Sequence, residues 1–170
     1  KAATRALRAV HASFYLSATT LSVGIIGPGT VGRVLLEQIA SQSARLQRDF
    51  KLDLRVRGIM SSKQMILAEK GVSLEGWQRE LAASGTPANL AAFVEHVGAD
   101  YLPHHVIIDC TASGEVAKHY PDWLAAGIHI VTPNKKANSA AMSFYRGMQL
   151  ARREGGAHYL YEATVGAGLP

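Results

Sequence analysis

The sequence contains a single cysteine, Cys110, among its 170 residues. One thiol cannot form an internal disulfide, so a small fold held by disulfides is excluded and a reducing compartment such as the cytoplasm is expected. No apolar stretch approaches the roughly 20 residues that a membrane-spanning helix needs. The basic opening segment also lacks an apolar core followed by a cleavage site, so we expect no secretory signal and no membrane partner.

Acidic residues are also few, because 13 Asp and Glu stand against 18 Lys and Arg for a net charge of +5. The basic residues are dispersed and no aromatic-rich basic motif accompanies them, so no nucleic-acid partner is expected. The alternative of a nonspecific basic scaffold would require nucleic-acid affinity that falls steeply with salt. The seven histidines are equally dispersed and lack the spacing of a zinc site.

A glycine-rich segment lies between an apolar run that begins at Leu21 and a predicted helix. The spacing G-x-G-x-x-G between strand and helix is typical of dinucleotide-binding proteins. Gly27 allows the tight turn, Gly29 lets the backbone approach a pyrophosphate, and Gly32 lets the helix pack close to the strand. The alternative is a turn whose glycines only need a positive φ. The predicted cofactor contacts of this segment are Ile26, Gly27, Pro28, Gly29, Thr30, Val31 and Gly32.

Strands and helices alternate along the rest of the chain. The helix after the glycines carries one apolar face, formed by Val31, Val34, Leu35 and Ile39, and the polar residues 41–50 are expected to end it. Further strands are predicted at residues 52–60, 106–111, 128–131 and 157–162. Helices are predicted from residue 64 to 71 and over 73–84, 88–97, 114–126 and 139–154, with a kink at Pro121 in the fourth. This order predicts a Rossmann-type α/β fold with a doubly wound, mostly parallel sheet.

Small polar residues and a lysine follow two of the predicted strands. Ligands of such sheets bind beyond the carboxyl ends of the strands. Thr111, Ala112 and Ser113 are small enough to let a cofactor pass, and two of them carry hydroxyl groups. Lys135 follows Thr-Pro-Asn, where proline fixes the turn, and would bring an ammonium group to the reacting end. A solvated surface lysine is the alternative for Lys135.

The end of the second predicted strand carries no acidic residue. Folds that bind NAD usually place an acid there to hold the ribose 2′-hydroxyl. Here the strand is followed by Ser61, Ser62 and Lys63, and Asp53 lies at its other end. Hydroxyl groups and a lysine suit a 2′-phosphate, so we predict NADP as the cofactor, with NAD as the alternative, and Ser61 and Lys63 among its contacts.

Four motifs in this order resemble those of one family. They are Ile-Ile-Gly-Pro-Gly-Thr-Val-Gly, Ile-Asp-Cys-Thr-Ala-Ser, Val-Thr-Pro-Asn-Lys-Lys-Ala-Asn and Tyr-Glu-Ala-Thr-Val-Gly-Ala-Gly-Leu-Pro. Together they resemble the cofactor domain of homoserine dehydrogenase. The resemblance implies reversible, NAD(P)H-dependent reduction of aspartate 4-semialdehyde to L-homoserine in the biosynthesis of aspartate-family amino acids such as threonine and methionine. It also implies that Gly27–Gly32, Thr111 and Lys135 contact the cofactor, with Lys135 close to the nicotinamide and the small-molecule substrate.

The last motif implies a sodium site. Its ligands by resemblance are the carboxylate of Glu162 and the carbonyl groups of Val165, Ala167 and Leu169. A hard cation held by oxygen ligands on a tight loop is chemically reasonable. From the residues alone, the same loop would be interpreted only as flexible.

The resemblance also implies a domain organisation. Residues 1–20, predicted to be a helix with Leu7, Val10 and Phe14 on one face, resemble the end of the regulatory region of bifunctional aspartokinase–homoserine dehydrogenases. Residues 21–162 would form the cofactor domain and 163–170 the start of a catalytic domain. We therefore expect a fragment that is inactive alone and in which no residue can be assigned as the catalytic acid. The full-length enzyme is expected to be a homo-oligomer, in the plastid stroma for a plant or alga. The alternative is a nucleotide-binding module without catalysis.

Overall fold

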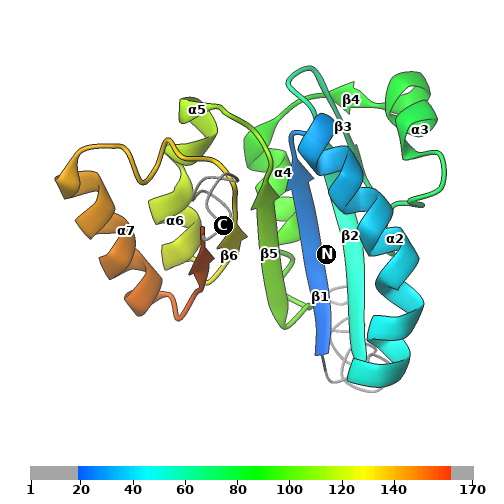
Figure 1. Ribbon diagram of the computed structural model, residues 1–170, viewed down its shortest axis with the longest axis horizontal. Coiled ribbons are helices and arrows are strands. Elements are labelled where there is room, and N and C mark those ends of the chain that lie inside the picture. Colours follow the sequence, from blue (N-terminus) through cyan, green and yellow to red (C-terminus); the bar gives the residue numbers. More distant parts are fainter. Residues whose placement is uncertain (1–18, 162–170) are drawn as a thin grey trace, which may run out of the picture.

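The computed structural model describes residues 19–161, which form one seven-stranded sheet in the order β4-β3-β2-β1-β5-β6-β7 (Figure 1). Five neighbouring strands are parallel: β2 (Leu52–Met60), β1 (Thr19–Ile26), β5 (His104–Asp109), β6 (His129–Val131) and β7 (Tyr159–Leu160). β3 (Gln64–Leu67) and β4 (Thr86–Pro87) add an antiparallel edge beside β2. The predicted mostly parallel, Rossmann-type sheet is therefore confirmed.

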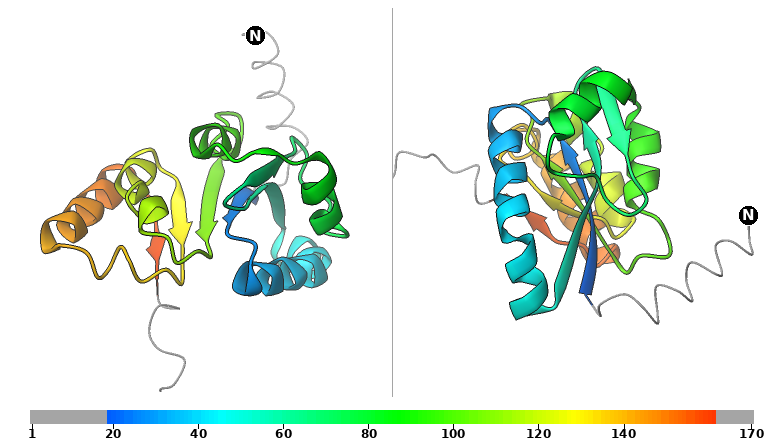
Figure 2. Two further views of the ribbon diagram at one scale, coloured as in Figure 1. Left: turned by 90° about the horizontal axis from the view of Figure 1, so that it is seen from above. Right: turned by 90° about the vertical axis from the view of Figure 1, so that its right-hand side faces the viewer.

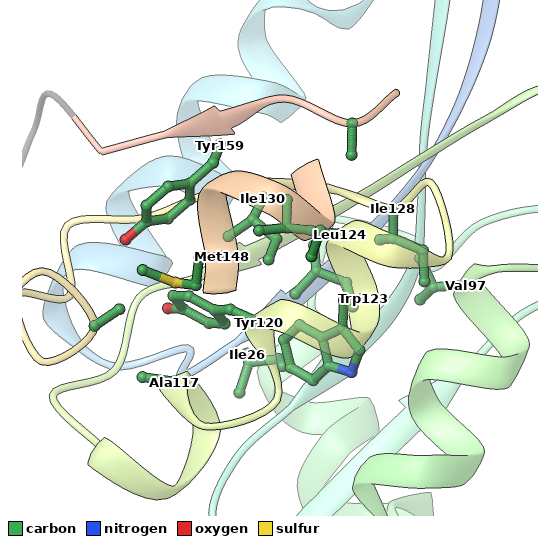
Figure 3. Packing of buried hydrophobic residues seen from close by; sticks show 14 of the residues in the cluster. Ile26, Val97, Ala117, Tyr120, Trp123, Leu124, Ile128, Ile130, Met148 and Tyr159 are labelled. Carbon is green, nitrogen blue, oxygen red and sulfur yellow. The ribbon is translucent and has the colours of Figure 1, made fainter. Parts of the chain in front are cut away.

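Helices cover both faces of the sheet, as Figure 2 shows. On one face, α2 (Thr30–Phe50) and α3 (Trp77–Ser84) contribute to a core with β1 and β2. On the other face lie α4 (Leu90–Val97), α5 (Gly114–Ala117), α6 (Tyr120–Ala125) and α7 (Met142–Glu154). The core of this second face gathers aromatic and aliphatic side chains from the last three strands and from these helices, as Figure 3 shows for Tyr120, Trp123, Leu124, Ile130, Met148 and Tyr159.

α2 differs from the prediction in its end and in its buried face. The polar residues 41–50 do not end the helix, which continues to Phe50 and stops where Lys51 adopts a left-handed φ of 54°. The side buried against the sheet consists of Gly32, Leu36 and Ile39, whereas Val31 and Val34 are exposed. The predicted apolar face was therefore wrong for Val31 and Val34, whereas Ile39 is buried and Leu35 is partly buried against the same core. The small Gly32 lets the helix approach the sheet on a side shifted from the predicted one.

The segment after Ser61 forms a strand, not the predicted helix. Ile66 of β3 lies opposite Ile59 of β2, so the apolar run 65–67 completes a hairpin. A short apolar run fits a strand or a helix equally well by pattern alone, and here the pairing with β2 decides. Similarly, the helix predicted over residues 114–126 divides into α5 and α6, with Pro121 in the first turn of α6.

The remaining boundaries move by a few residues. β1 begins at Thr19, so the helix predicted over residues 1–20 does not include Thr19 or Thr20, and the rest of it lies outside the described residues. α3 and α7 each begin later than predicted, β5 ends at Asp109, and β7 ends at Leu160. None of the helices in the described part of the chain combines the length and the apolar character needed to cross a membrane.

Candidate functional site

The carboxyl ends of four parallel strands meet at one edge of the sheet. Ile26, the last residue of β1, lies opposite Met60 of β2 on one side and Asp109 of β5 on the other. β6 continues the edge, because Val131 lies opposite Ile108 of β5. β1 is followed in the sequence by β2 on one side, and the chain then crosses to β5 on the other (Figure 1). Such a switch point is where open α/β sheets bind ligands.

Gly27 and Gly32 are required by the close packing of the turn after β1. Gly27 has a φ of +84°, and a Cβ there would lie 2.6 Å from the Cγ2 atom of Thr111. A Cβ on Gly32 would lie 2.4 Å from the carbonyl oxygen of Gly27. The Gly27 amide also donates to the Met60 carbonyl at 2.8 Å. These two glycines therefore let the turn, α2 and the loop after β5 approach one another.

Gly29 has different surroundings. It is the N-cap residue of α2, and a Cβ on it would have nothing within 4 Å. No side chain caps the helix, and its first turn contains no acidic residue. The amide groups of a first helical turn have no partner within the helix and carry a partial positive charge. The turn therefore offers an open, uncapped helix N-terminus that fits a pyrophosphate.

The other predicted residues of this turn lie around Gly29. The side chain of Ile26 is buried in the core, and its carbonyl accepts a 2.8 Å bond from the Cys110 amide, so only its backbone reaches the edge. Pro28 is half-buried, whereas Thr30 and Val31 are exposed. The structure thus brings all the predicted residues of the turn to one place but gives Ile26 a packing role.

The turn between β2 and β3 lies next to the glycine turn. Its Ser61 hydroxyl donates to the Gln64 carbonyl and accepts from the Gln64 amide, both at 3.0 Å. This hydroxyl is therefore used to close the hairpin. The side chain of Lys63 is exposed at the same turn, and Asp53 lies opposite Thr20 at the far end of β2.

The loop after β5 lies on the other side of the glycine turn. Thr111 faces Gly27, and its hydroxyl oxygen accepts a 3.0 Å bond from the Ser113 amide. The Ser113 hydroxyl accepts from the Val116 amide and so caps α5. Ala112 between them is exposed. The two hydroxyl groups thus order the loop, and its small residues leave Ala112 facing solvent.

A buried polar network beneath this loop was missed by sequence reasoning. Asp109 is fully buried and its carboxylate accepts from the Thr111 amide at 2.8 Å, the Tyr120 hydroxyl at 2.6 Å and the Asn134 side-chain amide at 3.0 Å. The hydroxyl of Thr132 donates to the Asp109 carbonyl at 2.8 Å. A polar residue at the end of the apolar stretch 106–108 is the signal that could have revealed it.

Tyr120 joins this network to the apolar core. Its ring packs against those of Trp123 and Tyr159, each with 5.8 Å between ring centroids (Figure 3). Burial, and then the neighbouring Asp109, raise the pKa of the Tyr120 hydroxyl well above its usual range. The hydroxyl therefore keeps its proton and acts as a hydrogen-bond donor.

Lys135 and Cys110 have contrasting surroundings at this edge. Lys135 follows the buried Asn134 in the loop after β6, and its own side chain is exposed. Burial, and then Asp109, raise the pKa of the Cys110 thiol to about 11. Cys110 therefore carries little of the reactive thiolate at neutral pH and packs beneath Gly32 instead.

The predicted sodium ligands Glu162, Val165, Ala167 and Leu169 lie outside the described residues. Within residues 19–161, no three His, Cys, Asp or Glu side chains are grouped so that they could hold a metal ion.

Comparison with known proteins identifies close relatives. Residues 27–162 match the family model described as the NAD-binding domain of homoserine dehydrogenase. The chloroplastic bifunctional aspartokinase/homoserine dehydrogenase 1 of Zea mays is 52% identical over 98% of this chain, which spans 18% of that protein. The homoserine dehydrogenase of Schizosaccharomyces pombe is 33% identical over 91% of the chain, which spans 41% of its length.

Solved structures agree with these sequence matches. A protein of unknown function from Candida auris superimposes with a TM-score of 0.76 and 28% identity, covering 90% of this chain and 41% of its own. A hyperthermophilic archaeal homoserine dehydrogenase in complex with NADPH has a TM-score of 0.66 and 25% identity, covering 86% and 45%. The chain thus spans only part of each of these relatives. It belongs to the family of homoserine dehydrogenase NAD-binding domains.

Proposed function

We propose that this chain binds NADP(H) at the edge formed by the turn after β1 and the loops after β2, β5 and β6. The observation that carries the proposal is the contrast among the three glycines. Gly27 and Gly32 are packed against the protein, whereas Gly29 faces open space at the uncapped N-terminus of α2. A dinucleotide pyrophosphate is the anion that such a turn accommodates.

The residues proposed to hold the cofactor come from four loops. The glycine turn would receive the pyrophosphate, Lys63 the adenosine ribose, and the loops carrying Thr111 and Lys135 the nicotinamide end. A bound nicotinamide accepts or supplies a hydride. Lys135 would bring a positive charge to the polar oxygen of the substrate, so its contribution is electrostatic.

We further propose that the chain serves reversible reduction of aspartate 4-semialdehyde to L-homoserine, because its relatives are named homoserine dehydrogenases. The test is a spectroscopic assay of homoserine-dependent NADP⁺ reduction. It uses the protein in the form in which its native source produces it, with and without Lys135→Ala. Turnover that Lys135→Ala lowers by about a hundredfold or more supports the proposal. Cofactor binding without any turnover would instead favour a nucleotide-binding module.

Three further features are proposed from the same relationship. They are a sodium site at Glu162, Val165, Ala167 and Leu169, assembly with further copies of the same chain, and a plastid location, since the plant relatives are named chloroplastic. Replacing sodium by potassium in the assay, in the parent protein and in Glu162→Gln, tests the first. If both proteins respond alike to the change of cation, Glu162 is not a sodium ligand.

The preference for NADP over NAD depends on Lys63. Its exposed ammonium group lies at the turn beside the glycines, Asp53 is at the far end of β2, and one structural relative was solved with NADPH. Lys63→Glu is expected to weaken NADPH about tenfold or more, equivalent to about 1.4 kcal/mol, and to leave NADH nearly unchanged. The measurement is a calorimetric titration with both cofactors at one moderate salt concentration, because an exposed contact is screened by salt.

The matched control is Lys70→Glu, which reverses an exposed charge after β3. It should leave the ratio of the two affinities unchanged. Equal weakening of NADPH and NADH by Lys63→Glu would place Lys63 away from the ribose.

A further inference from the structure

We infer that Asn134 is a positioning residue. Together with Asp109 it fixes the loops proposed to meet the nicotinamide, and it has no part in positioning the residues proposed to meet the adenosine. This inference rests on the proposed function, because it assigns a role within the same binding edge. Both residues lie within motifs named above, but the sequence assigned no role to either. Neither side chain is exposed enough to serve as a main contact for a ligand.

The side chain of Asn134, in the loop after β6, bonds to three residues and connects its own loop with the end of β5 and the loop that follows it. Its amide nitrogen donates to the Asp109 carboxylate at 3.0 Å and to the Ser113 carbonyl at 2.9 Å. Its side-chain oxygen accepts from the Lys136 amide at 3.0 Å. Both amide hydrogens and the side-chain oxygen of Asn134, which is 3% exposed, thus form hydrogen bonds. These bonds connect the loops after β5 and β6.

Asp109 makes this junction rigid from the other side. Its carboxylate accepts bonds from the Thr111 amide and the Tyr120 hydroxyl as well as from Asn134, so it connects the loop after β5, α6 and the loop after β6. Fully satisfied buried networks hold one geometry, because breaking any bond leaves a desolvated group without its partner.

The residues on either side of this junction are those proposed to meet the nicotinamide end. Thr111 and Ser113 lie in one loop, and Lys135 lies between Asn134 and Lys136, whose amide Asn134 holds. The bonds of the Asn134 side chain go to Asp109, Ser113 and Lys136 and not to the glycine turn or to Lys63. Gly27 is held by its bond to Met60, and Lys63 belongs to the turn that Ser61 closes. Thr111 packs against Gly27, but its amide is held by Asp109. Loss of the Asn134 bonds should therefore displace the nicotinamide loops relative to each other and spare the adenosine side.

Two ligands distinguish the two halves. Adenosine 2′,5′-bisphosphate carries the adenosine and its phosphates, whereas NADPH also carries the nicotinamide. In calorimetric titrations, Asn134→Ala is expected to weaken NADPH binding about tenfold or more, because the loops that meet the nicotinamide would then have to be ordered on binding. The affinity of this variant for adenosine 2′,5′-bisphosphate should stay within about twofold of the parent value, because this ligand does not reach the displaced loops.

Asn138→Ala is the matched control. This asparagine belongs to the same loop, but its side-chain oxygen accepts from the Tyr159 hydroxyl of β7 at 3.0 Å. It should change neither affinity.

A reciprocal exchange covers the case in which Asn134→Ala fails to fold. Asn134→Asp places a second carboxylate against Asp109 and should weaken NADPH binding. Adding Asp109→Asn to this variant again pairs a donor with an acceptor between the two residues, and should recover part of the lost affinity. Equal weakening of both ligands by Asn134→Ala, or no recovery in the double variant, would overturn the inference. Failure of the parent protein to bind NADPH would instead contradict the proposed function.

Discussion

At the scale of single residues, three glycines of one turn differ in what surrounds them. A side chain on Gly32 would press on the Gly27 carbonyl, whereas a side chain on Gly29 would meet nothing. Gly32→Ala is therefore expected to lower the free energy of unfolding by about 2 kcal/mol or more. Gly29→Ala should cost less than about 1 kcal/mol, the usual scale of a changed helix cap. Urea unfolding measures both, and equal losses would contradict this difference.

Single residues also show where sequence reasoning stops. The spacing of the glycines identified the turn because its chemistry is local, and the absence of an acid after β2 was visible without a structure. Asp109 and Asn134 are 25 positions apart, and only the pairing of β5 with β6 brings their loops together. Ser61 shows the opposite case, because its hydroxyl has a local backbone partner that reduces its availability to a ligand.

At the scale of elements, the alternation of strands and helices was predictable, while several lengths and one element type were not. Hydrophobic periodicity identifies an element that has one buried face, so α2 could be found but not its polar second half, which packs little. β3 depends on its register with β2 and could not be predicted from four residues. α2 buries the side formed by Gly32, Leu36 and Ile39 because the helix approaches the sheet closely at Gly32. A search for periodic apolar residues does not count a glycine and therefore misses this side.

A buried arginine joins several elements. Arg57 of β2 is 1% exposed and donates to the carbonyl groups of Glu69 at 3.1 Å and His96 at 2.6 Å and to the Tyr101 hydroxyl at 2.8 Å. It also pairs with the Glu69 carboxylate at 3.0 Å, but that side chain is 53% exposed. The backbone bonds should therefore contribute more to stability than the ion pair.

Arg57→Met should lower the free energy of unfolding by about 2–4 kcal/mol, because buried carbonyl groups lose their donors. Glu69→Gln should cost less than about 1 kcal/mol, because the Glu69 carboxylate is largely solvated and the buried guanidinium keeps its bonds to carbonyl groups. Denaturant titrations of both variants test this order, and a larger loss in Glu69→Gln would show that the ion pair dominates.

At the scale of the whole molecule, three histidines make stability depend on pH. Burial is the main cause that lowers the pKa of His96, His105 and His129, followed by Arg57 for His96 and by His158 for His129. A histidine with a lowered folded-state pKa binds fewer protons folded than unfolded, so its contribution to stability is complete above about pH 6.5 and is lost below it.

The free energy of unfolding is thus expected to fall as the pH is lowered from about 7.5 to 5.5, above the range in which most carboxylates titrate. Urea unfolding at several pH values measures it. His129→Gln should reduce the slope of stability against pH, because one of the three titrating histidines is removed. Glutamine keeps an acceptor for the His158 amide, which bonds to the His129 ring at 2.9 Å. Stability that rises toward acidic pH would contradict the burial of these histidines.

The binding of a dinucleotide pyrophosphate at the open side of Gly29 is what we propose above all for this molecule. Its most direct test is a calorimetric titration of NADPH into the parent protein and into Gly29→Val, with thermal unfolding followed in parallel. We predict saturable binding by the parent and affinity weaker by about a hundredfold or more, about 2.7 kcal/mol, in Gly29→Val. The melting temperature should change little, because the space beyond Gly29 is empty. Unchanged NADPH affinity in Gly29→Val, with the fold intact, would contradict the account.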